Sequence, residues 1–268
     1  MNIPEALVLG LVQGLTEFLP VSSSGHLVIV PYLLGWDMPS TSFDIVLHLG
    51  TMVAVLAYFW KDIVDIIAAF SQTGRTAVAR RRLGVLIVIG TVPAAVAGAL
   101  FEKKFEEVFA APAEVAVFLL LTGVLLFLSE AAARRIRNID QLKVGDSLLI
   151  GAAQAVAIFP GISRSGSTIS TGLFLGLTRE AAARYSFLLS IPIIAGAALF
   201  KLRHGFSGGN GEDAATLTAG FIVAAVSGFL AIKFLLGFVR RHDLRGFAYY
   251  CWAAGAFVIL VEIIRHVA

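Results

Sequence analysis

Six long apolar runs set the strongest constraint on the fold of this chain, because each can cross a lipid bilayer as one helix. A bilayer core requires about 20 residues of helix. The runs lie at about 42–60, 84–101, 114–131, 183–203, 215–238 and 247–267. Only 15% of the residues are charged, whereas a soluble domain carries about 25%. The sequence therefore predicts an all-α, multi-pass membrane protein in which residues 1–268 form a single membrane domain.

Two other apolar segments, residues 7–35 and 148–176, resemble each other at a shift of 141 residues without a gap. The positions that are identical in both copies are Leu7, Gly10, Gln13, Phe18, Ser22, Ser24, Gly25, Leu34 and Gly35, matched by Leu148, Gly151, Gln154, Phe159, Ser163, Ser165, Gly166, Leu175 and Gly176. Chance similarity between apolar segments favours Leu and Ala, whereas here Gln, Ser and Gly also match. The pattern indicates an internal repeat, with the first copy in about residues 1–141 and the second in about 142–268.

Neither repeated segment fits a simple membrane span. In the first, helix can run from about Pro4 to Phe18, which covers ~22 Å of a ~30 Å core. Pro20 then breaks the helix, and the serines at 22–24 offer turn and N-cap chemistry for a second short helix. The second copy is broken in the same way at Pro160-Gly161. Non-helical backbone survives at membrane depth only where protein or a water-filled cavity surrounds it. We therefore expect two re-entrant helix–turn–helix hairpins with buried tips.

Eight simple spans without hairpins are the alternative topology. Proline, glycine and serine gather in the middle of both segments, as in the broken helices of transporters, and this disfavours the alternative.

The distribution of basic residues predicts the orientation. With two hairpins and six crossings, one face holds fourteen basic residues: Lys61, Arg75, Arg80, Arg81, Arg82, Arg134, Arg135, Arg137, Lys143, Arg179, Arg184, Arg240, Arg241 and Arg245. The other face holds five: Lys103, Lys104, Lys201, Arg203 and Arg265. Cytoplasmic loops carry the excess of Lys and Arg, so both termini are expected outside. Three crossings separate the copies, which predicts an inverted-topology repeat whose tips meet near the midplane.

Both tips are predicted to bind anions. Each second half-helix begins at a tip, where it presents unpaired backbone N–H groups and the positive end of the helix dipole. Arg164 adds a guanidinium fork suited to phosphate oxygens, and an arginine at membrane depth is usually functional. Hydroxyl donors surround these groups, namely Ser22, Ser23, Ser24, Ser163, Ser165, Ser167 and Thr168. The alternative for Arg164 is a packing salt bridge with Glu17.

The first tip also carries a candidate metal site. Gln13 and Glu17 are four residues apart, so they share one face at the end of the first half-helix. A carboxylate beside the exposed carbonyl groups of a helix end is an oxygen site suited to Mg²⁺ or Ca²⁺. Such an ion would neutralise phosphate charge and polarise a phosphoryl group.

His26 is the candidate for proton transfer. It lies about one turn into the second half-helix, near Ser22 and Ser23. There it suits a general acid/base or a phosphoryl acceptor, although a lone histidine in an apolar helix is more often structural. Asp44 and His48, four residues apart at the start of the first crossing, could support the site from behind.

Two stretches resemble the signatures of the bacterial undecaprenyl-diphosphate phosphatases, the bacitracin-resistance membrane family. Residues 13–26, QGLTEFLPVSSSGH, resemble the (E/Q)xxxE signature, and residues 160–168, PGISRSGST, resemble the PGxSRSxxT signature. The resemblance covers nearly the whole chain, including the stretch FDIVLHLGTMVAVL after the first motif. Gln13 stands where some members carry Glu, which removes one candidate metal-ligand charge and shifts weight to Glu17.

The resemblance implies a membrane hydrolase that removes the terminal phosphate of undecaprenyl diphosphate. It would recycle the lipid carrier for peptidoglycan and other wall polymers, which affects cell shape, and a higher level would give bacitracin resistance. The implied catalytic residues are Glu17, Ser23, His26 and Arg164. The residues expected to bind the substrate phosphates are Ser22, Ser24, Gly161, Ser163, Arg164, Ser165 and Thr168. The nucleophile stays open between Ser23, His26 and water.

The implied location is the bacterial inner membrane, with the site facing the extracytoplasmic side because the first tip enters from there. The expected partners are the polyprenyl lipid substrate and membrane lipids, with no nucleic acid, and a homodimer is left open. Inverted repeats with broken helices are also transporter architecture. A lipid-carrier flippase is therefore the alternative function.

Overall fold

A computed structural model describes residues 1–108, 111–205 and 213–267, and within them the chain forms eleven α-helices and one short 3₁₀ helix. The helices are α1 (Ile3–Phe18), α2 (Ser23–Leu34), α3 (Thr41–Tyr58), α4 (Trp60–Ala68), α5 (Arg75–Val108), α6 (Pro112–Ala132), η1 (Ile139–Gln141), α7 (Val144–Val156), α8 (Arg164–Phe174), α9 (Arg179–Gly205), α10 (Ala214–Phe238) and α11 (Arg245–Val267). Six of them, α3, α5, α6, α9, α10 and α11, are long and apolar enough to cross a membrane. The predicted all-α fold with six spans is confirmed.

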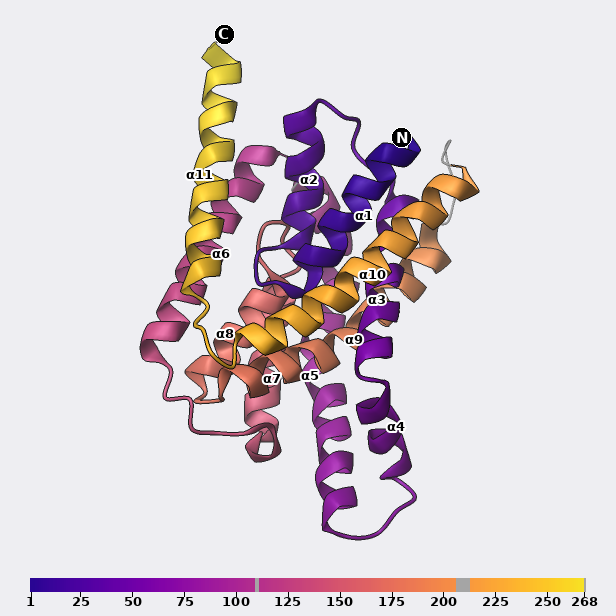
Figure 1. Cartoon of the computed structure of the whole chain (residues 1–268), viewed down its shortest axis with the longest axis vertical. Helices are drawn as coiled ribbons and strands as arrows, with labels where there is room; N and C mark the ends of the chain where they lie inside the picture. The colour runs from indigo at the N-terminus through magenta and orange to yellow at the C-terminus, as the bar shows by residue number, and fades with distance from the viewer. Residues whose placement is uncertain (109–110, 206–212, 268) are drawn as a thin grey trace.

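Both repeated segments are broken where the sequence predicts. The first tip, residues 19–22, separates α1 from α2, and the second tip, residues 157–163, separates α7 from α8. In Figure 1, α1 and α2 occupy the upper half of the molecule, whereas α7 and α8 lie lower. A serine caps the helix after each tip: Ser22 Oγ accepts from the Gly25 N–H group at 3.3 Å, and Ser163 Oγ accepts from the Gly166 N–H group at 3.0 Å. These caps satisfy backbone donors that a helix start leaves unpaired.

The short helices pack closely on long spans through glycine. A Cβ atom at Gly14 of α1 would lie 2.6 Å from the Ala224 carbonyl oxygen of α10, and a Cβ atom at Gly151 of α7 would overlap the Gly90 carbonyl oxygen of α5. Small residues allow such close backbone approach between membrane helices. The spans α10 and α5 therefore support α1 and α7, and through them the two tips.

The main departure from the predicted elements is α4, which lies in a segment expected to be a loop. It follows α3 after Phe59, and no residue of α4 is buried. Next, α5 begins at Arg75, well before the predicted start at residue 84. The two helices form the lowest part of the molecule in Figure 1. Charged contacts join this part to α9, since Asp62 accepts a hydrogen bond from Arg184. A nine-residue helix among charged residues is too short to stand out from hydropathy alone.

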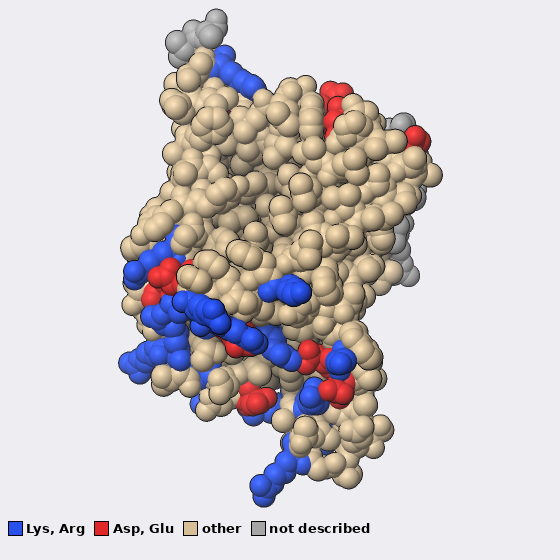
Figure 2. Space-filling view, viewed as in Figure 1, with Lys and Arg blue, Asp and Glu red and all other residues tan. Residues whose placement is uncertain are grey.

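On the face drawn in Figure 2, Lys and Arg gather over the lower half of the molecule, and few of them appear on the upper half. The side chains of Lys103, Lys104, Lys201 and Arg203, four of the five basic residues predicted on the other face, lie outside the described residues.

The close approach of α1 and α10 yields a stability prediction. The substitution Gly14→Ala should lower the free energy of unfolding by about 1–3 kcal/mol, because the new methyl group forces two packed helices apart. Thermal unfolding of the purified protein in detergent measures the change. The control is Gly237→Ala on α10, where an added Cβ atom meets nothing within 4 Å. Equal unfolding temperatures for the two variants would contradict the prediction.

Candidate active site

The two tips lie against each other in the middle of the fold. Ser165 Oγ, at the start of α8, donates to the Leu19 carbonyl oxygen of the first tip at 3.0 Å. On the other side, Thr122 of α6 braces the second tip. Its hydroxyl group donates to the Gly161 carbonyl oxygen and accepts from the Ser163 N–H group, both at 3.1 Å. Backbone groups that the broken helices leave unpaired are thus satisfied by neighbouring elements.

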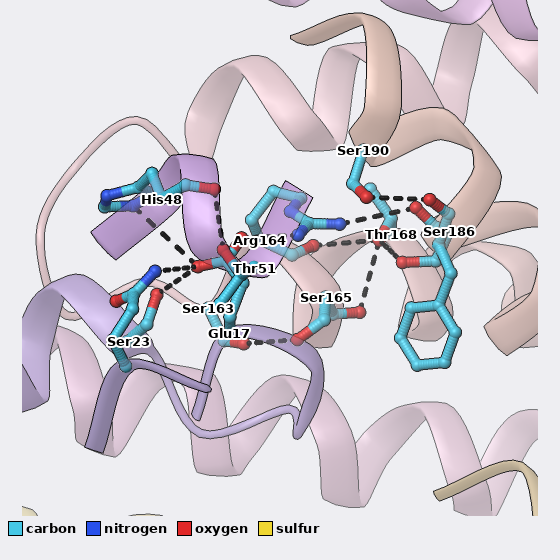
Figure 3. Close-up of polar contacts among 12 residues, drawn as sticks. Glu17, Ser23, His48, Thr51, Ser163, Arg164, Ser165, Thr168, Ser186 and Ser190 are labelled. Carbon is cyan, nitrogen blue, oxygen red and sulfur yellow. Dashed lines mark hydrogen bonds and ion pairs between the residues drawn. The ribbon is translucent and has the colours of Figure 1, made fainter. Parts of the chain in front are cut away.

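Glu17, at the end of α1, is the centre of the site (Figure 3). Its side chain is only 6% exposed. Oε1 accepts a hydrogen bond from Arg164 Nη2 at 2.6 Å. Oε2 accepts from Ser23 Oγ at 2.6 Å and from Gln13 Nε2 at 3.1 Å. His48 Nε2 lies 3.8 Å from the same oxygen. The structure thus brings together groups from α1, α2, α3 and α8.

The salt bridge with Glu17, the alternative role of Arg164, is therefore present. Arg164 also donates from Nη1 to the Ser186 carbonyl oxygen of α9 at 3.3 Å. The Ser186 hydroxyl group is 2.6 Å from Thr168 Oγ1, which in turn donates to the Arg164 carbonyl oxygen at 2.8 Å. These contacts fix the guanidinium group between Glu17 and α9. A fixed guanidinium group costs little further ordering when it receives a phosphate.

Ser23 is the hydroxyl group best placed for nucleophilic attack. Its O–H donates directly to the Glu17 carboxylate, which is the pairing of nucleophile and base used in covalent catalysis. Ser22, just before it, has a φ of 70° and a ψ of 97°. A positive φ is uncommon for a residue other than glycine and is found mainly where surrounding contacts enforce it.

A cavity of about 390 Å³ opens beside these groups. The polar residues of its lining are Glu17, Ser22, Ser23, Ser24, Asp44, His48 and Arg164. The other lining residues are apolar, namely Ile45, Ala157, Ile158, Pro160, Ile162, Ile193, Ile194, Ala197 and Ala198. A lining of both kinds suits a molecule with a charged head and an apolar tail.

The predicted site residues differ in how they meet this cavity. Gln13 is buried behind Glu17. Gly161, Ser163, Ser165 and Thr168 do not line the cavity, and their contacts hold the second tip and Arg164 in place.

His26 also lies outside the cavity lining. Its Nδ1 is 2.8 Å from the Ser22 carbonyl oxygen, and its Nε2 is 2.7 Å from the hydroxyl group of Tyr250 on α11. In this arrangement its ring nitrogens are bonded to groups other than Glu17 and Ser23. Its role in proton transfer stays a prediction.

Sequence reasoning missed several residues that shape the site. Thr122, Ser186 and Tyr250 each lie in a long apolar helix, where the only signal was a polar side chain in the span. His48 was expected to act from behind, but it reaches the cavity itself.

The donor set for a divalent ion is small. Among the residues that the structure describes, no three His, Cys, Asp or Glu side chains gather in a way that could hold a metal ion. The available oxygen atoms are those of the Glu17 carboxylate and Gln13 Oε1, which is buried and has no hydrogen-bond partner among the described residues. Mg²⁺ is commonly held by one or two carboxylates together with substrate phosphates and water. These residues fit an ion that arrives with a phosphorylated substrate.

The buried ion pair gives a second stability prediction. The substitution Arg164→Met should cost about 3–5 kcal/mol of unfolding free energy, because it leaves the Glu17 charge buried without its partner. The double variant Glu17→Gln/Arg164→Met should recover much of that loss, since no charge is then stranded. Unfolding of both variants in detergent measures the difference, and a double variant less stable than Arg164→Met would refute it.

Comparisons with known proteins identify the family of this chain. Residues 6–257 match the family described as Bacitracin resistance protein BacA. A protein of Moorella thermoacetica named Undecaprenyl-diphosphatase is 43% identical, with 99% of this chain and 100% of the relative covered. Relatives with the same name from Rubrobacter xylanophilus and Geobacter sulfurreducens are 46% and 44% identical and cover 96% and 97% of this chain, and 97% and 98% of their own lengths. The chain belongs to the BacA bacitracin-resistance family.

Proposed function

We propose that this protein is an integral membrane phosphatase that hydrolyses undecaprenyl diphosphate to undecaprenyl phosphate and inorganic phosphate. The observation that carries the proposal is the meeting of Ser23, Glu17 and Arg164 from two broken helices at one cavity. These three groups suit the reaction in the relatives' name, as a nucleophile, a base and a phosphate-binding cation.

The geometry suggests the order of events. Ser23 Oγ attacks the terminal phosphorus while its proton passes to Glu17 Oε2, the oxygen it already contacts. The bond from that phosphorus to the bridging oxygen breaks, and its electron pair leaves with undecaprenyl phosphate. Water then attacks the phosphorylated serine and releases inorganic phosphate while Ser23 regains a proton. A water molecule held at the same place could attack directly, with Glu17 as its base.

Arg164 has two partners in this scheme. It pairs with Glu17 before substrate arrives, and it stabilises the charge on the transferred phosphoryl group when substrate is bound. The proposed divalent ion, Mg²⁺ or Ca²⁺, would be held by Glu17, with Gln13 Oε1 beside it, and would neutralise diphosphate charge. The starts of α2 and α8 add the positive ends of two helix dipoles.

The apolar lining of the cavity suits the polyprenyl chain. Four of the apolar lining residues belong to the second half of α9, beyond Ser186, which Arg164 contacts: Ile193, Ile194, Ala197 and Ala198. An isoprenoid tail could lie against them while its diphosphate contacts Arg164 and the other polar lining residues. Entry from the side is expected, because a long polyprenyl chain stays in the lipid phase.

We further propose that the fold is an inverted-topology repeat with two re-entrant hairpins. The packing of α1 on α10 through Gly14 has a counterpart in the packing of α7 on α5 through Gly151. The two broken pairs lie in opposite halves of the molecule (Figure 1). The excess of Lys and Arg over the lower half (Figure 2) supports an orientation with that half in the cytoplasm. The first tip then enters from the extracytoplasmic side of a bacterial inner membrane.

In this location the enzyme would return the lipid carrier to peptidoglycan and wall-polymer synthesis and would contribute to bacitracin resistance, in keeping with the family description. Nothing in the comparisons favours a lipid-carrier flippase, and the relatives reported above are named for the phosphatase. A homodimer stays a prediction.

Phosphate release from a purified preparation tests the proposal. With an isoprenyl diphosphate and Mg²⁺ in detergent, the native chain should release phosphate, whereas Ser23→Ala, Glu17→Gln and Arg164→Ala should each be slower by about 10²–10⁴-fold. A chelator should abolish the activity, and added Mg²⁺ should restore it. The control is Ser71→Ala, at an exposed position beyond α4. No phosphate release by clean native protein would refute the enzyme and favour transport.

Labelling of introduced cysteines tests the orientation. Asp37→Cys lies between α2 and α3, and Ser71→Cys lies between α4 and α5, both at exposed positions. A membrane-impermeant maleimide should label position 37 in intact cells and position 71 only after permeabilisation. The native Cys251 is buried and should contribute little background. The reverse pattern would overturn the orientation.

A further inference from the structure

A chain of contacts runs from α11 to the first tip through Tyr250 and His26, neither of which lines the cavity. The Tyr250 hydroxyl group is 2.7 Å from His26 Nε2, and the two rings stack with their centroids 5.7 Å apart and an interplanar angle of 11°. His26 Nδ1 is 2.8 Å from the Ser22 carbonyl oxygen. Ser22 directly precedes Ser23, the proposed nucleophile.

The partners of His26 define its tautomer. A carbonyl oxygen only accepts hydrogen bonds, so Nδ1 carries the hydrogen and donates it to Ser22. In the neutral ring, Nε2 is then the acceptor and takes the hydrogen of the Tyr250 hydroxyl group. Both ring nitrogens are therefore used, and the ring is not among the groups that line the cavity.

The carbonyl group that His26 holds belongs to the strained residue of the tip. Ser22 has a φ of 70° although it is not glycine, and such a conformation persists only when surrounding contacts enforce it. Its carbonyl oxygen also accepts from the His26 backbone N–H group at 3.2 Å. The direction of the next residue, Ser23, depends on this conformation, and Ser23 Oγ must point at Glu17 Oε2 for the proposed attack.

Helix α11 offers a firm base for these contacts. Cys251, next to Tyr250, is buried, and its Sγ lies 3.8 Å from the Pro20 carbonyl oxygen of the same tip. Trp252 donates from Nε1 to the Leu120 carbonyl oxygen of α6 at 3.2 Å. Three consecutive residues of α11 thus join the first tip to α6, the helix that braces the second tip through Thr122.

We propose that Tyr250 and His26 are positioning residues for Ser23. Tyr250 orients the imidazole ring, and the Nδ1–H group of His26 holds the Ser22 carbonyl group, so that the Ser23 hydroxyl group is directed at Glu17. His26 then serves the reaction through the backbone of the tip and transfers no proton to or from substrate. This inference rests on the proposed phosphatase function and assigns a task to α11, which contributes nothing to the cavity lining.

Substitutions of His26 separate positioning from proton transfer. In His26→Asn, the side-chain amide nitrogen lies near the place of Nδ1 and can still donate to Ser22, but it cannot exchange protons. We expect kcat for phosphate release within about fivefold of the native value for His26→Asn. For His26→Ala we expect kcat about 10²-fold lower, since misplacement by about 1 Å has that order of effect. Thermal unfolding in detergent verifies that both variants are folded. A folded His26→Asn variant as slow as His26→Ala would overturn the proposal.

Tyr250 is tested with a matched neighbour. Tyr250→Phe keeps the ring but loses the hydroxyl group, and loss of one hydrogen bond of about 0.5–1.5 kcal/mol corresponds to a kcat about two- to tenfold lower. The control is Tyr249→Phe, because Tyr249 is exposed and its ring, which the substitution keeps, contacts only Phe127 and Trp252 among the described aromatic rings, so that this variant should keep the native rate. A Tyr250→Phe variant at the native rate would overturn the role of Tyr250. No phosphate release by the native chain and Tyr249→Phe alike would instead refute the proposed function itself.

Discussion

A carboxylate that is 6% exposed in an apolar helix bundle needs partners for both oxygens, and Glu17 accepts hydrogen bonds from Gln13 of α1, Ser23 of α2 and Arg164 of α8. Because burying this charge without a partner is costly, the two tips must meet for the fold to be stable. Arg164 can neutralise Glu17 only if α8 starts beside the end of α1. The same requirement sets Ser23 against the carboxylate. The geometry of the site and the stability of the contact between the tips therefore depend on one ion pair, and a bound substrate would compete for Arg164.

Broken helices at this depth raise a second requirement, because their free backbone groups must be bonded inside the protein. The long helices α6 and α11 together meet this requirement. Thr122 of α6 bonds two backbone groups of the second tip, while Tyr250 and Cys251 of α11 act on the first tip, one through His26 and one at Pro20. The two helices pack along each other, with the Trp252 indole bonded to α6. The tips are thus held by one common support, and this explains how a non-glycine residue can keep a positive φ in the first of them.

Much of this could be predicted from local pattern, because apolar length, proline and serine act over a few residues. The breaks near Pro20 and Pro160 and the spans themselves follow from such signals. For Arg164 the sequence left two roles open, phosphate binding and a salt bridge with Glu17, because local pattern cannot place residues that are 147 positions apart. The direction of the His26 side chain was beyond sequence reasoning, because its partner Tyr250 lies 224 positions away on a helix with no motif. Helix α4 was not predicted, because it is short and lies among charged residues.

The two repeated segments share the serine cap but differ in the charged side chains at their tips. Both tips carry a serine cap of the same form. At the end of α1, however, Gln13 donates a hydrogen bond to Glu17. Its counterpart Gln154 has Ile158 four residues later in place of Glu, and neither amide atom of Gln154 has a hydrogen-bond partner among the described residues. A second carboxylate at position 158 would repel the first across a shared cavity, since Ile158 lines the same cavity as Glu17. Glu17 from the first segment and Arg164 from the second instead form a pair without net charge, which a buried site can tolerate.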